Sequence, residues 1–186
     1  MSEEANYRSY RDSGVDVTRG DECSRIAYRA CRKTFGYQDL LEPKRSEGGF
    51  AGLMRINSDL RGASLVKNSD GIGTKALVAQ RVGRYDTLGY DLIAMLADDT
   101  ASTGAVPVVG TNTIDMARAG PELVEGLMDG LVDACEVADV SMVGGEVAEV
   151  PDQVKGYSDC PFIWNGDMIG LMEPDREIDG SRIEPG

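Results

Sequence analysis

The segment Asp70-Gly71-Ile72-Gly73-Thr74-Lys75 constrains this chain more than any other part of its sequence. It follows a strand-like run, Ser64 to Lys67, and precedes a run that is predicted to be helical as far as Val82. Glycine lets the backbone approach an anion closely, and free N–H groups at a helix start favour phosphate. Lys75 adds a positive charge, and Asp70 is suited to bind Mg²⁺. The spacing is not that of a P-loop, and a glycine turn with a surface lysine remains the alternative.

Two further segments place carboxylates in unusual surroundings. Asp98-Asp99 interrupts an otherwise apolar helix, where a carboxylate is costly unless it is paired or binds a metal. The alternative is that both are exposed. Gly144-Gly145-Glu146 follows a predicted buried strand, at a strand-to-loop junction of the kind that often carries a site, or it is a plain loop exit. An earlier loop, Gly48-Gly49-Phe50, either closes over phosphates or is a simple hairpin loop. Carboxylates beside glycine turns suit a Mg²⁺-nucleotide better than a redox cofactor.

Hydrophobic periodicity predicts an α+β domain with helices packed on a mixed sheet. We expect a polar arm at residues 1–22 with an extended piece around Gly14 to Val17, one domain at 23–174, and the start of a linker at 175–186. Helices are predicted at Ser24–Lys33, at 75–82, from Asp86-Thr87 to near Gly104, and from Pro121 to near Cys135. Strands are predicted at Leu53–Ile56, Ser64–Lys67, Pro107–Thr111, Val140–Val143 and Phe162–Leu171, with a loop at Pro43–Gly52.

Composition argues against several classes of function. The net charge is −13, from 32 acidic and 19 basic residues, which argues against a nucleic-acid-binding surface. No run approaches the roughly 18 apolar residues of a membrane helix, and the polar start is not a secretory signal, so we expect a cytoplasmic protein. There is no histidine, and the four cysteines form no C-x-x-C pair, which argues against structural zinc. Basic residues that are mostly Arg, in so acidic a chain, indicate either a salt-rich cytoplasm or a solubilising surface.

Several motifs, in the right order, resemble the aminoimidazole ribonucleotide synthetases, which are also called phosphoribosylformylglycinamidine cyclo-ligases. The resemblance extends over nearly the whole chain. The matching segments are Tyr10–Asp16, Gly48–Phe50, Ser69–Lys75, Tyr85–Met95, Val143–Pro151 and Ile178–Ser181.

This resemblance implies an amino-terminal domain that forms a homodimer through a shared β-barrel and binds ATP and Mg²⁺ near that interface. It implies a reaction that closes the imidazole ring of formylglycinamidine ribonucleotide by electrostatic activation and positioning. It also implies a second, carboxy-terminal domain, so we expect the chain alone to be incomplete. By matching position, Lys75 and Asp70 would be catalytic, the metal ligands would be Asp70, Asp98, Asp99 and Glu146, and the nucleotide contacts would be Gly48, Gly49, Phe50, Gly71, Gly73, Thr74, Lys75, Gly144 and Gly145.

Departures from the family pattern keep two other hypotheses open. The chain has Asp98 where the family usually has Asn, Asn112 where it commonly has Asp, and Val147 where it has Thr. One alternative is another ATP-using member of the same superfamily, and the other is a non-catalytic dimeric nucleotide-binding module. Residues 44–52 contain no cysteine, which argues against selenophosphate synthetase.

Overall fold

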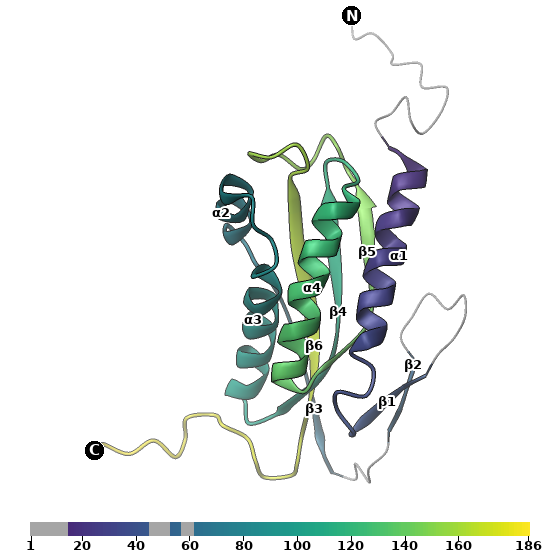
Figure 1. The fold of residues 1–186 in the computed structure, drawn as a ribbon. Helices are drawn as coiled ribbons and strands as arrows, with labels where there is room; N and C mark the ends of the chain where they lie inside the picture. Colours follow the sequence, from purple (N-terminus) through teal and green to yellow (C-terminus); the bar gives the residue numbers. More distant parts are fainter. Residues whose placement is uncertain (1–14, 45–52, 57–61) are drawn as a thin grey trace, which may run out of the picture.

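A computed structural model describes residues 15–44, 53–56 and 62–186, which form helices packed on one face of a sheet (Figure 1). The elements in chain order are α1 (Val17–Lys33), β1 (Leu41–Lys44), β2 (Leu53–Ile56), β3 (Ser64–Gly71), α2 (Lys75–Val82), α3 (Leu88–Ser102), β4 (Val106–Met116), α4 (Pro121–Ala138), β5 (Ser141–Glu149) and β6 (Phe162–Met172).

The main sheet has four strands in the order β3-β6-β4-β5. β4 and β5 run parallel, with α4 as the crossover between them, and the other two pairs are antiparallel. The register places Asp70, Gly166, Asn112 and Gly145 in one row across the four strands. The predicted α+β domain with a mixed sheet is therefore confirmed.

The main core lies between the sheet and helices α1, α3 and α4 (Figure 1). Trp164 on β6 is fully buried there. The predicted i, i+4 series of α4 is buried throughout, from Leu123 to Cys135, so the amphipathic pattern identified its core face correctly. A smaller cluster joins Leu41 of the β1–β2 hairpin to Val109 and Leu171 of the sheet.

The face of the sheet opposite the helices is contacted by the β1–β2 hairpin at one end. No helix of the described residues covers the rest of this face. We call it the open face. Side chains that are exposed on it include Leu65, Lys67, Thr113, Glu146, Ile163 and Asn165.

The structure corrects several predicted boundaries. α1 begins at Val17, not Ser24, because Asp16 caps it by accepting a hydrogen bond from the Arg19 N–H at 3.3 Å. Residues 17–22 are therefore helical rather than part of an arm. β1 is a strand that the sequence does not predict, and it includes Pro43, the first residue of the predicted loop Pro43–Gly52. The strand predicted to end at Val143 continues to Glu149, so Gly144-Gly145-Glu146 lies within β5 and not at a strand-to-loop junction.

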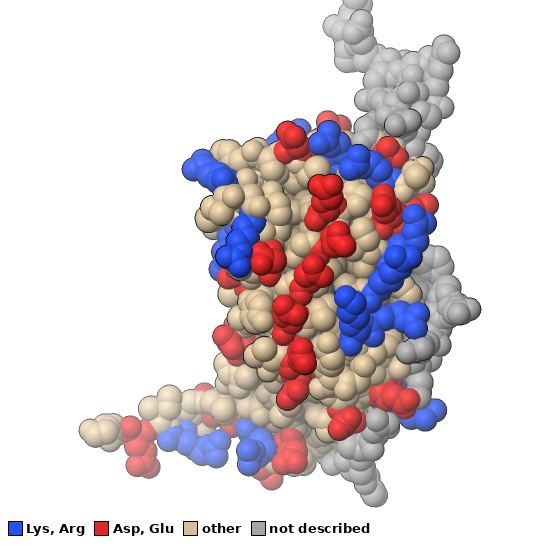
Figure 2. Space-filling view, viewed as in Figure 1, with Lys and Arg blue, Asp and Glu red and all other residues tan. Residues whose placement is uncertain are grey.

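Charge is distributed unevenly over the helical layer. Figure 2 shows a row of acidic side chains along α4 beside basic side chains over α1. The exposed acidic residues of α4 are Glu122, Glu125, Asp129, Asp133 and Glu136, and the exposed basic residues on the carboxy-terminal half of α1 are Arg25, Arg29, Arg32 and Lys33.

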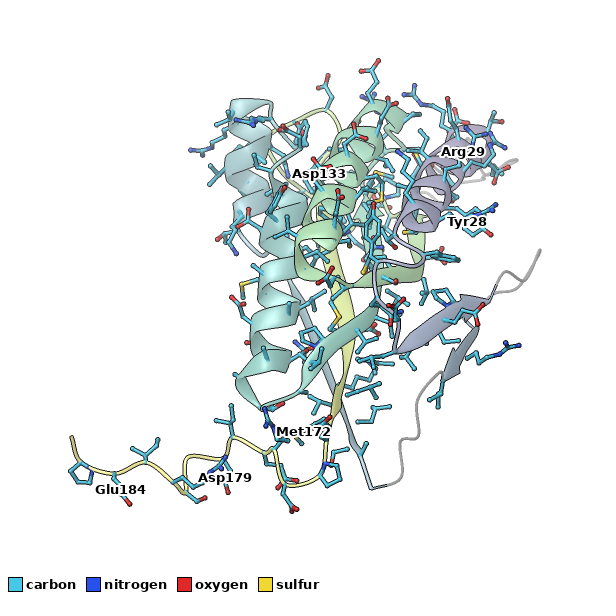
Figure 3. All side chains as sticks on the ribbon, turned by 60° about the horizontal axis from the view of Figure 1, so that its bottom comes forward. Tyr28, Arg29, Asp133, Met172, Asp179 and Glu184 are labelled. Atoms are coloured by element: carbon cyan, nitrogen blue, oxygen red, sulfur yellow. The ribbon has the colours of Figure 1, made fainter. Side chains whose placement is uncertain are left out.

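Beyond β6 the chain leaves the sheet. From Met172 it runs past Asp179 to Glu184 away from the helices (Figure 3). The Ile178 N–H of this segment donates to the carbonyl of Thr103, the residue that ends α3, at 2.8 Å. Across the described residues, we find no helix with the length and apolar character needed to cross a membrane.

Candidate functional site

The glycine turn predicted from the sequence connects β3 to α2. The Ile72 N–H donates to the Trp164 carbonyl at 3.1 Å and fixes the start of the turn, and Ile72 itself is buried. A Cβ on Gly71 would come within 2.9 Å of that carbonyl and 2.0 Å of Asn165 Oδ1, so only glycine fits. Gly73 has φ +54°, a left-handed conformation that favours glycine, and it has open space around it.

The turn presents unused hydrogen-bond donors. Among the described residues, the backbone N–H groups of Gly73 and Thr74 have no partner, and the Thr74 side chain makes no capping bond. Both residues are exposed. Two adjacent N–H groups at the start of a helix, followed by Lys75, form an arrangement that binds anions such as phosphate.

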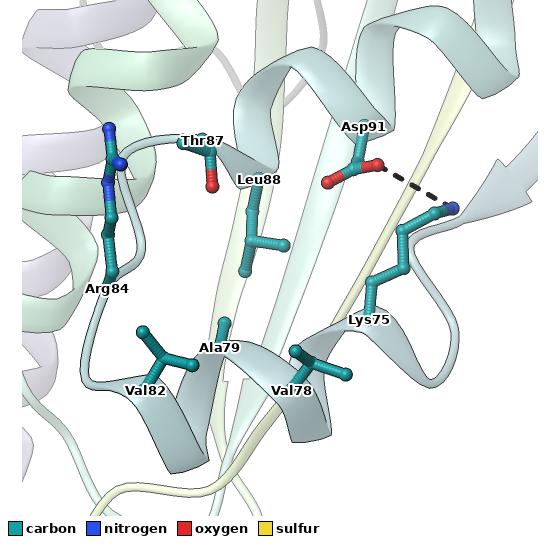
Figure 4. A pocket seen from close by; sticks show the side chains of 8 residues that line it. All are labelled: Lys75, Val78, Ala79, Val82, Arg84, Thr87, Leu88 and Asp91. Carbon is teal, nitrogen blue, oxygen red and sulfur yellow. Dashed lines mark ion pairs between the residues drawn. The ribbon is translucent and has the colours of Figure 1, made fainter.

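A pocket of about 300 Å³ opens beside Lys75, between α2 and the start of α3 (Figure 4). Its lining residues are Lys75, Val78, Ala79, Val82, Arg84, Thr87, Leu88 and Asp91.

The pocket is lined by apolar side chains of α2 and α3 and by the charged side chains of Lys75, Arg84 and Asp91. Lys75 Nζ lies 3.9 Å from Asp91 Oδ1 (Figure 4), a contact that joins the two helices. Arg84 donates from Nε to Asp86 Oδ1 at 2.8 Å, and this bond holds the pKa of Asp86 below its ordinary value. Val78 and Val82 leave exposed apolar surface on α2. Lys75 is the one lining residue that the sequence predicted as a site residue. Thr87, Leu88 and Asp91 lie in the segment Tyr85–Met95, which carries part of the family resemblance.

Asp70 lies on the helix-covered face of the sheet. It is opposite Gly166, where a Cβ would meet Leu96 of α3 at 2.9 Å. Residues opposite each other in a sheet point to the same side, so the Asp70 side chain points toward the helices. Its Oδ1 accepts from the Gly71 N–H at 2.6 Å, which leaves Oδ2 for another partner.

Asp98 and Asp99 are both exposed on α3. Of the two alternatives given for this pair, exposure of both carboxylates is therefore the correct one. The next residue, Thr100, is buried and donates from Oγ1 to Asn68 Oδ1 at 2.9 Å. Asn68 and Asp70 are two residues apart on β3 and share a face. Asp99 and Asp70 therefore lie on the same side of the sheet.

Glu146 lies on the opposite side of the sheet from Asp70. It is opposite Thr113, which is opposite Asn165, and all three side chains are exposed on the open face. Gly144 and Gly145 belong to the same edge strand, and a Cβ on Gly145 would meet the Asn112 carbonyl at 2.3 Å. Gly145 therefore permits close packing of β5 on β4, whereas a Cβ on Gly144 would make only an ordinary 3.9 Å contact with Thr111. The structure brings none of the three residues to the β3–α2 turn.

The predicted metal ligands are thus not gathered at one place in the chain. The described residues contain no group of three or more Asp, Glu or Cys side chains arranged to hold a metal ion. Asp70 and Asp99 remain candidates on one side of the sheet. Gly48, Gly49 and Phe50 lie outside the described residues, so their predicted role stays a prediction.

Comparison with known proteins relates most of the chain to one family. Residues 48–172 match the family described as "AIR synthase related protein, N-terminal domain". A phosphoribosylformylglycinamidine cyclo-ligase of Acetivibrio thermocellus is 34% identical over 179 residues, which are 96% of this chain and 51% of that protein. The enzyme of the same name from Pyrococcus furiosus is 34% identical over 178 residues, with 96% and 51% coverage. The chain thus spans about half the length of the curated relatives it matches.

Solved structures support the fold. A thiamine-monophosphate kinase from Stenotrophomonas maltophilia K279a superposes with a TM-score of 0.65 at 19% identity, over 85% of this chain and 45% of that one. The hydrogenase maturation protein HypE of E. coli gives 0.57 at 15% identity, over 87% and 47%. At this level of identity the likeness concerns the fold alone.

Proposed function

This chain belongs to the AIR synthase related family, of which it carries the amino-terminal domain, and from this premise we propose that it is the ATP-binding half of a phosphoribosylformylglycinamidine cyclo-ligase. The curated relatives that carry this name support the proposal. The whole enzyme would use ATP to close the imidazole ring of formylglycinamidine ribonucleotide in purine biosynthesis. A carboxy-terminal domain would complete the substrate site.

The observation that carries the proposal is the pair of unpartnered N–H groups at Gly73 and Thr74. They are exposed, adjacent in sequence and followed directly by Lys75. Charge-assisted hydrogen bonds from such groups to phosphate oxygens are stronger than neutral ones. We assign the ATP phosphates to this turn. Lys75 would break its ion pair with Asp91 and contact the phosphates with its positive charge.

Asp70 and Asp99 suit the Mg²⁺ that accompanies the nucleotide. Carboxylate oxygens are the ligands this ion prefers. Oδ2 of Asp70 has no partner among the described residues, and Asp99 is exposed on the same side of β3. When bound, Mg²⁺ would neutralise charge on the phosphates. Asp98 would add to the local negative potential.

The open face is where we place the second copy of a cytoplasmic homodimer. Leu65 is 64% exposed and Ile163 is 47% exposed on this face, although both are large apolar residues. Packing two open faces together would cover them and would close the two sheets into a shared β-barrel. Glu146, Gly144 and Gly145 would then lie at the interface between the two chains.

Calorimetric titration with Mg²⁺-ATP tests the proposal, in low salt and in molar KCl because the chain is so acidic. We expect micromolar binding that requires Mg²⁺ and weakens at least about tenfold in Lys75→Ala, the effect of losing one charged contact. Lys155→Ala is the matched control, since Lys155 is an exposed lysine whose Nζ donates to the Pro151 carbonyl at 3.1 Å, away from the β3–α2 turn. Folded protein that binds no Mg²⁺-ATP in either salt would overturn the assignment.

A second assay addresses the reaction itself. The chain is mixed with the separately produced carboxy-terminal half of a relative, and ADP release is followed with and without formylglycinamidine ribonucleotide. Release that depends on this substrate supports the cyclo-ligase. Tight Mg²⁺-ATP binding without any release, in a mixture in which the two halves associate, would instead favour a nucleotide-binding module.

A further inference from the structure

The charged side chains of α1 and α4 form a two-part surface on the helical layer. We call the five exposed acidic side chains of α4, from Glu122 to Glu136, the acidic row, and the four exposed basic side chains of α1, from Arg25 to Lys33, the basic row. The two rows lie side by side (Figure 2), and together we call them the charged face. Every exposed residue of α4 is acidic except Val137. Such a separation of charge favours contact with a surface of the opposite pattern.

The two rows lie at the same level along the sheet, because both helices are fixed to β5 at both ends. At one end, the Glu149 carboxylate accepts from the Asp16 N–H at 2.5 Å and from the Ala119 N–H at 2.7 Å, just before α1 and α4 begin. At the other end, Ser141 Oγ donates at 2.8 Å to the carbonyl of Thr34, the residue after α1. Helix α4 ends just before the same strand. The two helices therefore run side by side in the same direction.

The charges of the two rows are not paired within the chain. Among the residues that the structure describes, no ion pair involves either row. The rows carry five negative and four positive charges, a balance of −1, whereas the whole chain carries −13. A second copy of so acidic a chain is repelled over most of its surface. On the charged face, by contrast, each copy offers charges opposite to those of the other.

Each of the two helices also exposes a large side chain with apolar surface beside its row. Tyr28, next to Arg29 on α1 (Figure 3), is 48% exposed, and Arg32 Cζ lies 5.7 Å from the centre of its ring. Val137, near the end of α4, is 76% exposed. Tyr and Arg are enriched in protein–protein interfaces, where they contribute much of the binding energy. These residues indicate that the charged face contacts a protein and not a free ion.

Two-fold symmetry decides how two charged faces can pack on each other. With the axis parallel to the rows and midway between them, the acidic row of each copy lies on the basic row of the other. Rotation about this axis keeps the level along the rows, so opposite charges meet along their common length. With the axis across the rows, acidic lies on acidic and basic on basic, and such like-charge contacts are unfavourable.

We propose that two copies of this chain associate through the charged face, with α4 of each copy against α1 of the other. The acidic row is roughly 21 Å long at 1.5 Å per residue, and two packed helices are about 20 Å wide. The face therefore offers about 400 Å² per copy, which is about half of a standard interface. The association is accordingly weak, with a dissociation constant on the order of 100 µM. It depends neither on nucleotide binding nor on the open face.

Sedimentation velocity in low salt, at protein concentrations from about 10 to 500 µM, tests this interface. All chains carry Leu65→Ser and Ile163→Ser, which remove two large apolar side chains of the open face. Any association that remains then reports the charged face. We expect a monomer at the lowest concentration and a dimer at the highest.

Reversal of charge gives the decisive comparison. Glu125→Lys/Asp129→Lys/Asp133→Lys changes the charge of the acidic row from −5 to +1, and Arg25→Glu/Arg29→Glu/Arg32→Glu changes that of the basic row from +4 to −2. Each variant alone places like charges together and should associate at least about tenfold more weakly. An equal mixture of the two variants should form the dimer again, because each row then meets a row of opposite sign.

A matched control separates the charged face from net charge. Asp152→Lys/Asp159→Lys/Glu173→Lys makes the same change in net charge as reversal of the acidic row, at exposed positions outside both rows, and it should leave the dimer intact. The reversed positions are exposed too, so the variants keep the buried core. Protein that stays monomeric at about 500 µM before any reversal would overturn the proposal. So would reversed variants that dimerise alone as tightly as the unreversed chain, or a mixture that stays monomeric.

Discussion

Asp70 and Glu146 project from opposite faces of one sheet and from its two edge strands. Asp70 is on β3 and Glu146 on β5, with β6 and β4 between them. Three interstrand spacings separate the two backbones by roughly 14 Å. A single Mg²⁺ ion, with ligand distances of about 2 Å, cannot bind both carboxylates of one chain.

This relationship predicts that the two carboxylates differ in their contribution to Mg²⁺-ATP affinity. In dilute, monomeric protein, Asp70→Asn should weaken binding by about tenfold or more, through loss of a charged metal ligand. Glu146→Gln should change it less than about twofold. Asp129→Asn, which removes an exposed carboxylate of α4, is the control for net charge. An equal loss in Glu146→Gln would mean that this carboxylate reaches the site, for example from a second chain.

Two glycines of α4, one turn apart, should respond in opposite ways to the same substitution. A Cβ on Gly130 would lie 1.9 Å from the Asp86 carbonyl oxygen, a backbone atom, so Gly130→Ala should force α4 away and destabilise the fold by about 1–3 kcal/mol. A Cβ on Gly126 would have only an ordinary 3.6 Å contact with Tyr85. Gly126→Ala should therefore stabilise the fold by about 0.5–1 kcal/mol, as alanine favours the helix. Urea unfolding measures both changes, and a loss of stability in Gly126→Ala would contradict the geometry.

The buried amide of Asn112 should contribute to stability. Its Oδ1 accepts from Trp164 Nε1 at 2.9 Å, and the side chain is 3% exposed. Asn112→Ala leaves the indole N–H buried without an acceptor, so we expect a loss of about 1–3 kcal/mol in unfolding free energy. Thr113→Ala, its exposed neighbour, should change stability by less than about 0.5 kcal/mol. If both variants unfold at the same urea concentration, the hydrogen bond contributes little.

Alkaline pH should destabilise the fold through its buried thiols. Burial raises the pKa of Cys31 from 9.0 to about 11. Burial also raises the pKa of Cys135. The unfolded chain releases these protons near pH 9, while the folded chain retains them. The stabilisation is complete below pH 9 and is lost as pH rises toward 11, at roughly 1.4 kcal/mol per pH unit for each thiol. Unfolding free energies at pH 8, 9 and 10 measure the slope, which should be shallower in Cys31→Ala; an unchanged slope would exclude Cys31 as a cause.

Local sequence was sufficient wherever a structure depends on neighbours along the chain. The predicted span of β2 is exact in the structure, and α2, α4 and β6 have nearly the predicted limits, because side-chain periodicity is set within each segment. The β3–α2 turn was predicted for the same reason, since Gly73 meets a local backbone requirement, whereas the close approach that requires glycine at position 71 comes from β6. The early start of α1 was missed, although its capping residue Asp16 is visible in the sequence.

Only the tertiary structure decided which of these segments meet. Nothing in the local sequence separates Asp70 from Glu146, because strand order and the face of each side chain follow from long-range pairing. The same pairing carries β5 through two glycines that resembled a strand end, and the packing of α2 on α3 brings Asp91 to Lys75. The sequence by itself therefore determined most of the elements and the glycine turn between β3 and α2. The layout of the site depended on contacts between residues far apart in the chain, which have no local signature.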